Sequence, residues 1–421
     1  MRLARTLAAV AAAAAASACL PAHADEPRLV TRVGDTPQYA AIVPAARPLA
    51  APPPALVVLG KRLFNDPRLS QPAGTSCASC HDPATGFSSF NGGRDGVAAG
   101  SLRARLGTRN PPSLTYARYV PSLYFYQDDD ATVRSSFGGL MLDGHIDSLA
   151  SQVRDPLLAA NEMNLRTPEA LAERLKAAGY GKVMEQQFGP GVLQSGQRAI
   201  DAVGYSLQAY LQSDELSPFD SRFDAMLRGQ ATLTVEEMRG LALFRDTDKG
   251  NCASCHSVSV TSTNPARSLF TDFGYEALGV PRNRKLPANA TPGHYDLGLC
   301  MTARARRWPD PDAWCGYFRT PSLRNVAVRE RYMHNGAFDK LRDAVRFYAT
   351  RSTRPQDWYG HGPLFDDLPP VMRSNVNMVS TPLNRRPGAT AALSDEDIDA
   401  ITAFLRTLTD ARYAVTYRKA P

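Results

Sequence analysis

The pentapeptide Cys-Ala-Ser-Cys-His occurs twice in this chain of 421 residues, at residues 77–81 and again at 252–256. Two cysteines three positions apart, with a histidine directly after the second, form the attachment pattern of a c-type haem. The thiols bond to the two vinyl groups of the porphyrin, and the imidazole binds the iron. The pattern therefore predicts two covalently bound haems, one on Cys77, Cys80 and His81 and the other on Cys252, Cys255 and His256.

A Cys-x-x-Cys pair also occurs in zinc sites and in redox disulfides, but neither fits these residues as well as a haem does. A structural zinc site needs four ligands arranged as a tetrahedron. A thioredoxin-like redox pair needs no histidine after the second cysteine. The repetition of the whole pentapeptide also argues against a chance match, so we retain the haem interpretation for both copies.

The first 24 residues have the composition of a secretory signal peptide, with a positively charged start, an alanine-rich apolar run and small residues before Asp25. Cleavage before Asp25 would release an exported protein, which we expect in the periplasm. A lipoprotein acylated at Cys19 is the weaker alternative, because Ala16 lies where a large aliphatic residue is needed. No later apolar run approaches the ~20 residues of a membrane-spanning helix, so we expect no transmembrane segment.

Two further cysteines, Cys300 and Cys315, lie fifteen positions apart in the second half of the chain. In an oxidising compartment such a pair most simply forms a disulfide. The formal net charge of +7 is not gathered into a basic stripe, so the sequence gives no case for nucleic-acid binding. A mild positive charge is compatible with docking an acidic partner protein.

The chain divides into a signal peptide at 1–24, a Pro/Ala-rich arm at 25–55, and two haem domains at 56–215 and 232–421. A short amphipathic helix precedes the first haem motif, and a similar stretch precedes the second; each ends in Leu-Phe, as an internal duplication of one small cytochrome unit would leave. Further helices are predicted within 147–159, 167–179, 199–213, 340–351 and 394–410, and little alternating strand pattern is present. The predicted fold class is mainly α, with two cytochrome c-like domains and long loops.

Several collinear stretches carry a family resemblance beyond the haem motifs: "LGKRLFNDPRLS", "RNPPSLTYA", "PLLAANEMN", "FRTPSLRNVAVRERYMHNGAFDKLRDAV" and "LSDEDIDAITAFLRTLTD". With its two haem motifs, the sequence resembles the bacterial dihaem cytochrome c peroxidases and their MauG-like relatives. The likeness covers essentially the whole chain after the signal peptide. It implies a peroxide-reactive haem in the N-terminal domain and an electron-transfer haem in the C-terminal domain.

The resemblance also gives roles to residues around the first haem. Glu162 matches the distal acid/base of the family, and Gln152 matches a glutamine ten positions earlier. A carboxylate beside an open iron face can carry a proton from the near to the far peroxide oxygen, so that the O–O bond breaks heterolytically. The stretch between His81 and Asn110 holds no second histidine or methionine to cap this haem, although His145 could reach it from further along.

Tyr348 is the corresponding residue for the second haem. It lies fourteen positions after His334, where the better-known peroxidases of the family have a ligand methionine and the MauG-like proteins have a tyrosine. Leu341, Ala344, Val345 and Tyr348 share one helical face, so the side chain should point inward. From spacing alone it reads as a core tyrosine, but the resemblance favours an iron ligand. A phenolate stabilises higher oxidation states of iron than a thioether does.

Two family features are altered or incomplete in this sequence. The tryptophan that the family places between the haems is replaced by Leu142. A leucine side chain cannot form a cation radical, so charge sharing between the haems would require Tyr124 or Tyr126 to take the place of the tryptophan. The family also binds a calcium ion between the domains. Asn110 matches its side-chain ligand, with the carbonyl positions at Arg329 and Arg331, although two arginines beside a dication are unfavourable.

Together these observations predict a periplasmic dihaem peroxidase of the MauG-like branch. Its partners would be hydrogen peroxide and a small electron donor, either a cytochrome c or a cupredoxin. One alternative is a MauG-like oxidase that modifies aromatic residues of a partner protein. Another is a non-enzymatic dihaem electron carrier, which would need both irons capped.

Overall fold

The computed structural model describes residues 51–127 and 134–413, so the predicted signal peptide and nearly all of the predicted arm lie outside the described residues. The helices are α1 Pro54–Phe64, α2 Cys77–Cys80, α3 Leu149–Gln152, α4 Arg154–Leu158, α5 Pro168–Ala177, α6 Gly181–Phe188, α7 Gly196–Leu211, α8 Arg222–Leu227, α9 Val235–Arg245, α10 Leu341–Thr350, α11 Gln356–Tyr359 and α12 Asp395–Arg406. Within this part of the chain, none of the helices has the length and apolar character needed to cross a bilayer.

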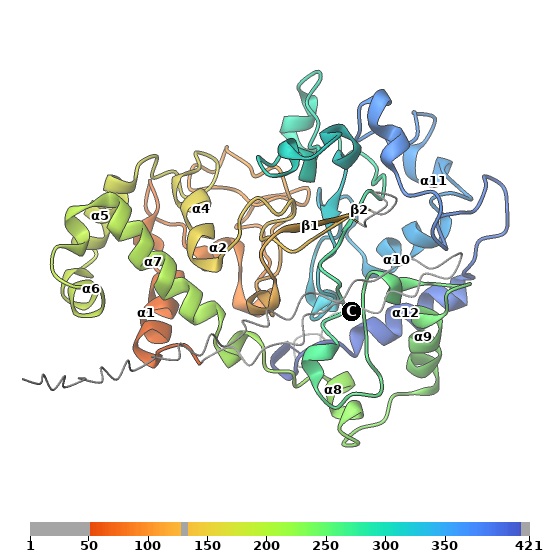
Figure 1. Ribbon diagram of the computed structural model, residues 1–421, viewed down its shortest axis with the longest axis horizontal. Helices are drawn as coiled ribbons and strands as arrows, with labels where there is room; N and C mark the ends of the chain where they lie inside the picture. Colours follow the sequence, from red (N-terminus) through yellow and green to blue (C-terminus); the bar gives the residue numbers. More distant parts are fainter. Residues whose placement is uncertain (1–50, 128–133, 414–421) are drawn as a thin grey trace, which may run out of the picture.

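The protein is helix-rich, as predicted, with long loops and two small antiparallel sheets (Figure 1). One sheet pairs β1 Tyr124–Gln127 with β2 Arg134–Phe137, and the other pairs β3 Tyr275–Glu276 with β4 Phe318–Arg319. The helix predicted within 147–159 is broken into α3 and α4. Pro156 explains the break, because a proline cannot donate the backbone hydrogen bond that a continuous helix would require there.

The same helix pairing occurs in both halves of the chain. In the first half α1 packs against α7, and in the second α9 packs against α12 (Figure 1). A Cβ atom on Gly60 of α1 would lie 1.9 Å from the Ser206 carbonyl oxygen, and one on Gly240 of α9 would lie 1.9 Å from that of Ala400. Both glycines therefore permit a backbone approach that no larger residue allows, which supports the predicted internal duplication.

Two separate clusters of buried apolar side chains follow this division. The first draws its buried members from Leu59 to Leu216, and the second draws them from Phe223 to Leu408. The second cluster contains a set of inclined aromatic rings in which Phe404 contacts Phe223, Phe244 and Phe270 at centroid distances of 6.0, 5.4 and 6.0 Å. Contacts of this kind fix ring orientation as well as burying area.

Buried polar contacts join the two halves of the chain. The Tyr116 hydroxyl donates to Asp410 at 2.6 Å, and the Asn325 amide donates to the other oxygen of Asp410 at 2.7 Å. Beside them the fully buried Arg324 pairs with Asp224 through two hydrogen bonds of 2.8 and 2.9 Å. A buried charge pair of this geometry requires both partners, since removing one leaves the other without compensation.

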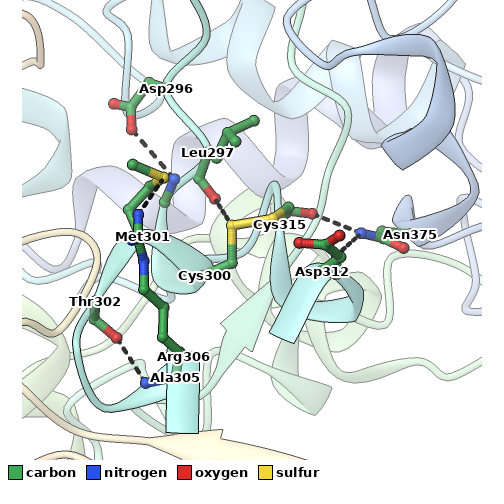
Figure 2. The surroundings of a disulfide bond; sticks show 11 residues. Asp296, Leu297, Cys300, Met301, Thr302, Ala305, Arg306, Asp312, Cys315 and Asn375 are labelled. Atoms are coloured by element: carbon green, nitrogen blue, oxygen red, sulfur yellow. Dashed lines mark hydrogen bonds between the residues drawn. A yellow bond between two sulfur atoms is a disulfide. The ribbon is translucent and has the colours of Figure 1, made fainter. Parts of the chain in front are cut away.

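Cys300 and Cys315 are joined by a disulfide in the structure (Figure 2). The carbonyl of Cys315 accepts a hydrogen bond of 3.0 Å from the Asn375 side chain, which ties this loop to a more distant segment. Leu297, Met301 and Gly316, all close to the disulfide in the sequence, line the large cavity described below. The disulfide therefore stabilises part of the wall of that cavity.

Replacing both cysteines of this disulfide with alanine should lower the free energy of unfolding by about 3 kcal/mol, the entropy of closing a loop of 15 residues. Urea unfolding followed by tyrosine and tryptophan fluorescence measures the change. A matched wild-type sample unfolded with dithiothreitol should lose a similar amount. Equal unfolding midpoints for all three samples would contradict a stabilising disulfide.

Candidate functional site

A cavity of about 780 Å³ extends between the two copies of the pentapeptide. Both cysteines and the histidine of each copy line it: Cys77, Cys80, His81, Cys252, Cys255 and His256. The cavity thus brings together two motifs that lie far apart in the sequence, one from each half of the internal repeat. None of the four cysteines Cys77, Cys80, Cys252 and Cys255 forms a disulfide in the structure.

The two motif histidines are held in the same way. His81 Nδ1 lies 3.0 Å from the Phe87 carbonyl oxygen, and His256 Nδ1 lies 2.9 Å from that of Phe270. Both phenylalanines have positive φ, 57° and 55°, which turns their carbonyls toward the rings. Burial lowers the pKa of each histidine to about 4. Each imidazole is therefore neutral at pH 7, with Nε2 available for a metal.

The cavity also contains cationic side chains whose hydrogen bonds go to neutral groups. Arg319 and Arg329 line it, and their guanidinium groups donate to the carbonyls of Met141, Pro111 and Arg331. No carboxylate within the described residues forms an ion pair with either of them, and burial lowers the pKa of Arg329 to about 10. A buried cation in this state requires an anion. Haem propionates have the charge and the reach to supply it, so the donor set fits the predicted group.

Glu162 lies in the cavity wall nearest the first motif. Its backbone carbonyl accepts from Ser101 N at 2.7 Å, and a Cβ on Gly100 would lie 2.4 Å from the Asn161 carbonyl, so this turn is closely packed. Burial, and then the charge of Asp155, raise the pKa of Glu162 to about 7. A carboxyl group with this pKa can both take up and release a proton near neutral pH.

Tyr348 lies at the opposite end of the cavity, on α10. Leu341, Ala344, Val345 and Tyr348 all line the cavity, which confirms that they share an inward face. Burial and the nearby thiols of Cys255 and Cys252 raise the pKa of the Tyr348 hydroxyl above its ordinary value. The phenol therefore lies within electrostatic reach of the second motif, and a bound metal cation would be needed to remove its proton.

Two further residues predicted near the first haem, Gln152 and His145, differ in whether they line the cavity. Gln152 lines the cavity, and its amide lies 3.6 Å from the Met141 sulfur. His145 does not reach the cavity as a ligand, because its two ring nitrogens contact Asp143 at 2.5 Å and Asp155 at 2.9 Å. The idea that His145 caps the first iron is therefore wrong, since both nitrogens already have carboxylate partners.

The predicted calcium ligand has mixed surroundings. Asn110 is buried, and its side-chain oxygen has no hydrogen-bond partner among the described residues, which suits a cation. Its amide nitrogen, however, lies 3.1 Å from the carbonyls of both Arg331 and Met333. The Arg329 carbonyl instead accepts from the Tyr332 hydroxyl at 2.9 Å. The backbone carbonyls beside Asn110 are those of Arg331 and Met333, whereas the family pattern predicted those of Arg329 and Arg331. Calcium binding at Asn110 therefore stays a prediction.

Comparison with known proteins places this arrangement in a family. Residues 54–232 match the family model described as di-haem cytochrome c peroxidase. The chain is 37% identical to the methylamine utilization protein MauG of Paracoccus denitrificans over 383 residues, which cover 89% of this chain and 94% of that protein. The chain belongs to the di-haem cytochrome c peroxidase and MauG family.

Two further relatives of this di-haem peroxidase carry peroxidase names. The cytochrome c551 peroxidase of Pseudomonas aeruginosa is 27% identical over 292 residues, covering 68% of this chain and 69% of that one. The crystal structure of the diheme peroxidase BthA from Burkholderia thailandensis matches with 54% sequence identity and a TM-score of 0.82, covering 86% and 87% of the two chains. The protein is thus an oxidoreductase of the di-haem peroxidase type, and family membership implies two haems.

The structure also shows features of this peroxidase that sequence reasoning missed. The guanidinium contacts of Arg319 and Arg329 and the carboxylate partners of His145 depend on tertiary contacts, and no local spacing indicated them. Leu142 lines the cavity at the position where the family tryptophan was expected. Tyr124 and Tyr126, proposed as its substitutes, are absent from the described cavity lining, so the structure gives no support for that substitution.

Proposed function

We propose that this protein reduces hydrogen peroxide at a haem bound to the first motif, with electrons delivered through a haem bound to the second. The observation that carries the proposal is the asymmetry of the cavity. Glu162, an acid with a pKa of about 7, faces the first motif, whereas Tyr348 faces the second. One end is suited to moving protons, and the other is suited to holding iron in a capped state.

At the first site the haem would supply the iron that binds peroxide and accepts its oxidising equivalents. Glu162 would take the proton from the near peroxide oxygen and return it to the far one, which leaves as water. Gln152, on the same wall, would orient the peroxide by hydrogen bonding. The packed turn around Gly100 holds Glu162 in place, and the imidazole of His81, fixed at Nδ1 by the Phe87 carbonyl, would bind the iron.

At the second site Tyr348 and His256, which both line the cavity, would bind the iron. The four motif thiols would anchor the haems covalently, two on each. Arg319 and Arg329 would neutralise propionates in the region between the motifs. The two buried clusters would correspond to two cytochrome c-like domains, at about 56–215 and 232–421, and a calcium ion at Asn110 would lie where these domains meet.

The predicted signal sequence supports a periplasmic location. The cytochrome c551 peroxidase name of one relative suggests that a small cytochrome, or a cupredoxin, is the electron donor here as well. The dihaem electron-carrier alternative loses support, because it leaves the buried acid at the first site without a role.

A Tyr348→Phe variant tests the assignment of the second site. We expect it to bind two haems, to lose the spectrum of a capped ferric second haem, and to have a higher reduction potential there, because phenolate favours the oxidised metal. Redox titration with optical detection measures the change. Tyr359→Phe, a buried tyrosine outside the cavity lining, is the control. Identical titrations for wild type and Tyr348→Phe would contradict iron ligation by Tyr348.

A second function, oxidation of aromatic side chains in a partner protein, is supported by one observation. The MauG relative matches over 89% of this chain, and that coverage includes both ends of the cavity. The two functions differ in the source of electrons. Rapid turnover of peroxide with a reduced small cytochrome would favour the peroxidase. Failure to turn over with any small donor would favour the protein-modifying oxidase.

A further inference from the structure

A cluster of charged side chains, Asp143, His145 and Asp155, adjoins the α4 turn that leads to Glu162. His145 Nδ1 contacts Asp143 at 2.5 Å, and His145 Nε2 contacts Asp155 at 2.9 Å. Asp155 belongs to α4, and two backbone hydrogen bonds connect it to the turn of Glu162: Ala159 N donates to the Asp155 carbonyl at 2.9 Å, and Glu162 N donates to the Ala159 carbonyl at 3.2 Å. The charge of Asp155 also raises the pKa of Glu162. The cluster therefore extends from Asp143, which lines the cavity, through His145 to Asp155, and Asp155 is coupled to the acid at the cavity wall.

The two ends of this cluster differ in their access to water. The side chains of His145 and Asp155 are 33% and 44% exposed, whereas that of Asp143 is only 10% exposed. Protons can thus enter at His145 and Asp155 from solvent. Proton transfer along such hydrogen bonds requires groups that both bind and release a proton, and histidine is the side chain best suited to this.

The surroundings keep His145 charged and in place. Its hydrogen bonds to Asp143 and then Asp155 raise its pKa to about 9, while burial opposes them. Asp143 is itself held by Arg109 at 2.7 Å, and the charge of Asp143 also acts on Arg319. On the other side the Tyr275 hydroxyl packs against Gly144, where an added Cβ would lie 1.9 Å from it. At neutral pH His145 is therefore a protonated acid with defined orientation.

Complete reduction of hydrogen peroxide to two waters consumes two electrons and two protons. Cleavage of the O–O bond needs no net proton, because the proton carried by Glu162 comes from the peroxide itself. Both protons are therefore required later, when the external donor returns the two electrons to the oxidised enzyme. The carboxyl of Glu162, in the cavity wall, must then receive protons from solvent.

We propose that His145, held between Asp143 and Asp155, is a positioning residue that supplies Glu162 with protons while the donor reduces the peroxide-oxidised enzyme. This inference rests on the proposed function. A second stage follows the reaction with peroxide, in which protons pass from solvent through His145 and Asp155 to Glu162. The first stage, the reaction with peroxide, does not need His145.

His145→Arg is the decisive variant, because arginine keeps the positive charge and both carboxylate partners but does not release its proton. In stopped-flow experiments on the di-haem enzyme we expect oxidation by peroxide at the wild-type rate. The return to the resting spectrum, on adding a reduced cytochrome, should be about tenfold slower. Proton uptake, followed with a pH-indicator dye in weakly buffered solution, should slow equally. An unchanged return phase would overturn the inference.

The pH dependence separates this role from a structural one. In the wild type the return phase should slow above about pH 9, where His145 loses its proton, and His145→Arg should lack this limb. His145→Ala provides a second test if arginine is not tolerated. Added imidazole should restore its return phase, and a slow alanine variant that imidazole does not accelerate would contradict proton supply.

Two variants separate the role of His145 in proton supply from the role of Glu162 in the reaction with peroxide. If Glu162→Gln leaves the peroxide phase unchanged, the proposed function itself is wrong. If Glu162→Gln slows that phase but His145→Arg has no effect on the return phase or its pH dependence, only the proton supply through His145 is wrong.

Discussion

The Glu162→Gln variant should react with hydrogen peroxide 10²- to 10⁴-fold more slowly than the wild type, on the order expected for loss of a general acid/base. Glutamine keeps the size and the packing of the side chain but cannot carry a proton. The variant should therefore lose the proton transfer that the raised pKa of Glu162 permits, while the cavity stays intact. Stopped-flow absorbance after mixing with peroxide measures the rate.

The pH dependence of this reaction gives an additional check. Glu162 must be ionised to take the proton from peroxide, so the wild-type rate should rise as the pH increases through about 7. The Glu162→Gln variant should lack this rise. Glu236→Gln, which changes an exposed carboxylate on α9, is the matched control and should behave as wild type. A Glu162→Gln variant with wild-type rate and pH profile would contradict the assignment.

Removal of either cysteine pair should remove one haem and should have different consequences at the two ends of the cavity. The double variant Cys77→Ala with Cys80→Ala should hold half the covalent haem and lose the reaction with peroxide. Cys252→Ala with Cys255→Ala should also hold half the haem. It should still react with peroxide at the first site, but should no longer turn over with an external donor.

Pyridine haemochrome analysis and intact-protein mass measure covalent haem in these variants, and circular dichroism shows whether each one folds. Single serine substitutions, which leave one thioether per motif, serve as milder versions if a double variant does not fold. Covalent haem at the wild-type level in both double variants would contradict attachment through these thiols. Equal loss of peroxide reactivity in both would contradict the division of roles between the sites.

Different parts of this site were predictable from the sequence for different physical reasons. The haem motifs could be predicted from spacing alone, because their ligands are neighbours in the chain and share one local turn. Glu162 and Tyr348 needed the family resemblance, since each lies far in the sequence from the motif with which it shares the cavity. The arginines that line the cavity and donate to backbone carbonyls became apparent only in the structure, because nothing local to Arg319 or Arg329 indicates burial.

The helices, like the site residues, were predictable from the sequence to different degrees. Among the helices that pack the two repeats, α1, α7 and α12 carry apolar residues along one face, and that pattern predicted them. Helix α9 is only weakly amphipathic and was predicted from the Leu-Phe pair that it shares with α1. Helix α6 was missed: it is short, and a glycine lies at each of its ends, which is typical of turns. The role suggested for His145 was wrong, since a histidine's partners depend on which carboxylates the fold brings beside it.

Under the proposed function one haem is open and reacts with peroxide, and the other is capped by Tyr348. Low-temperature electron paramagnetic resonance of the ferric protein, before and after one equivalent of hydrogen peroxide, distinguishes an open iron from a capped one. We predict one high-spin and one low-spin signal in the resting protein, with both lost on adding peroxide. Two low-spin signals that peroxide leaves unchanged would contradict an open first haem, and with it the proposed function.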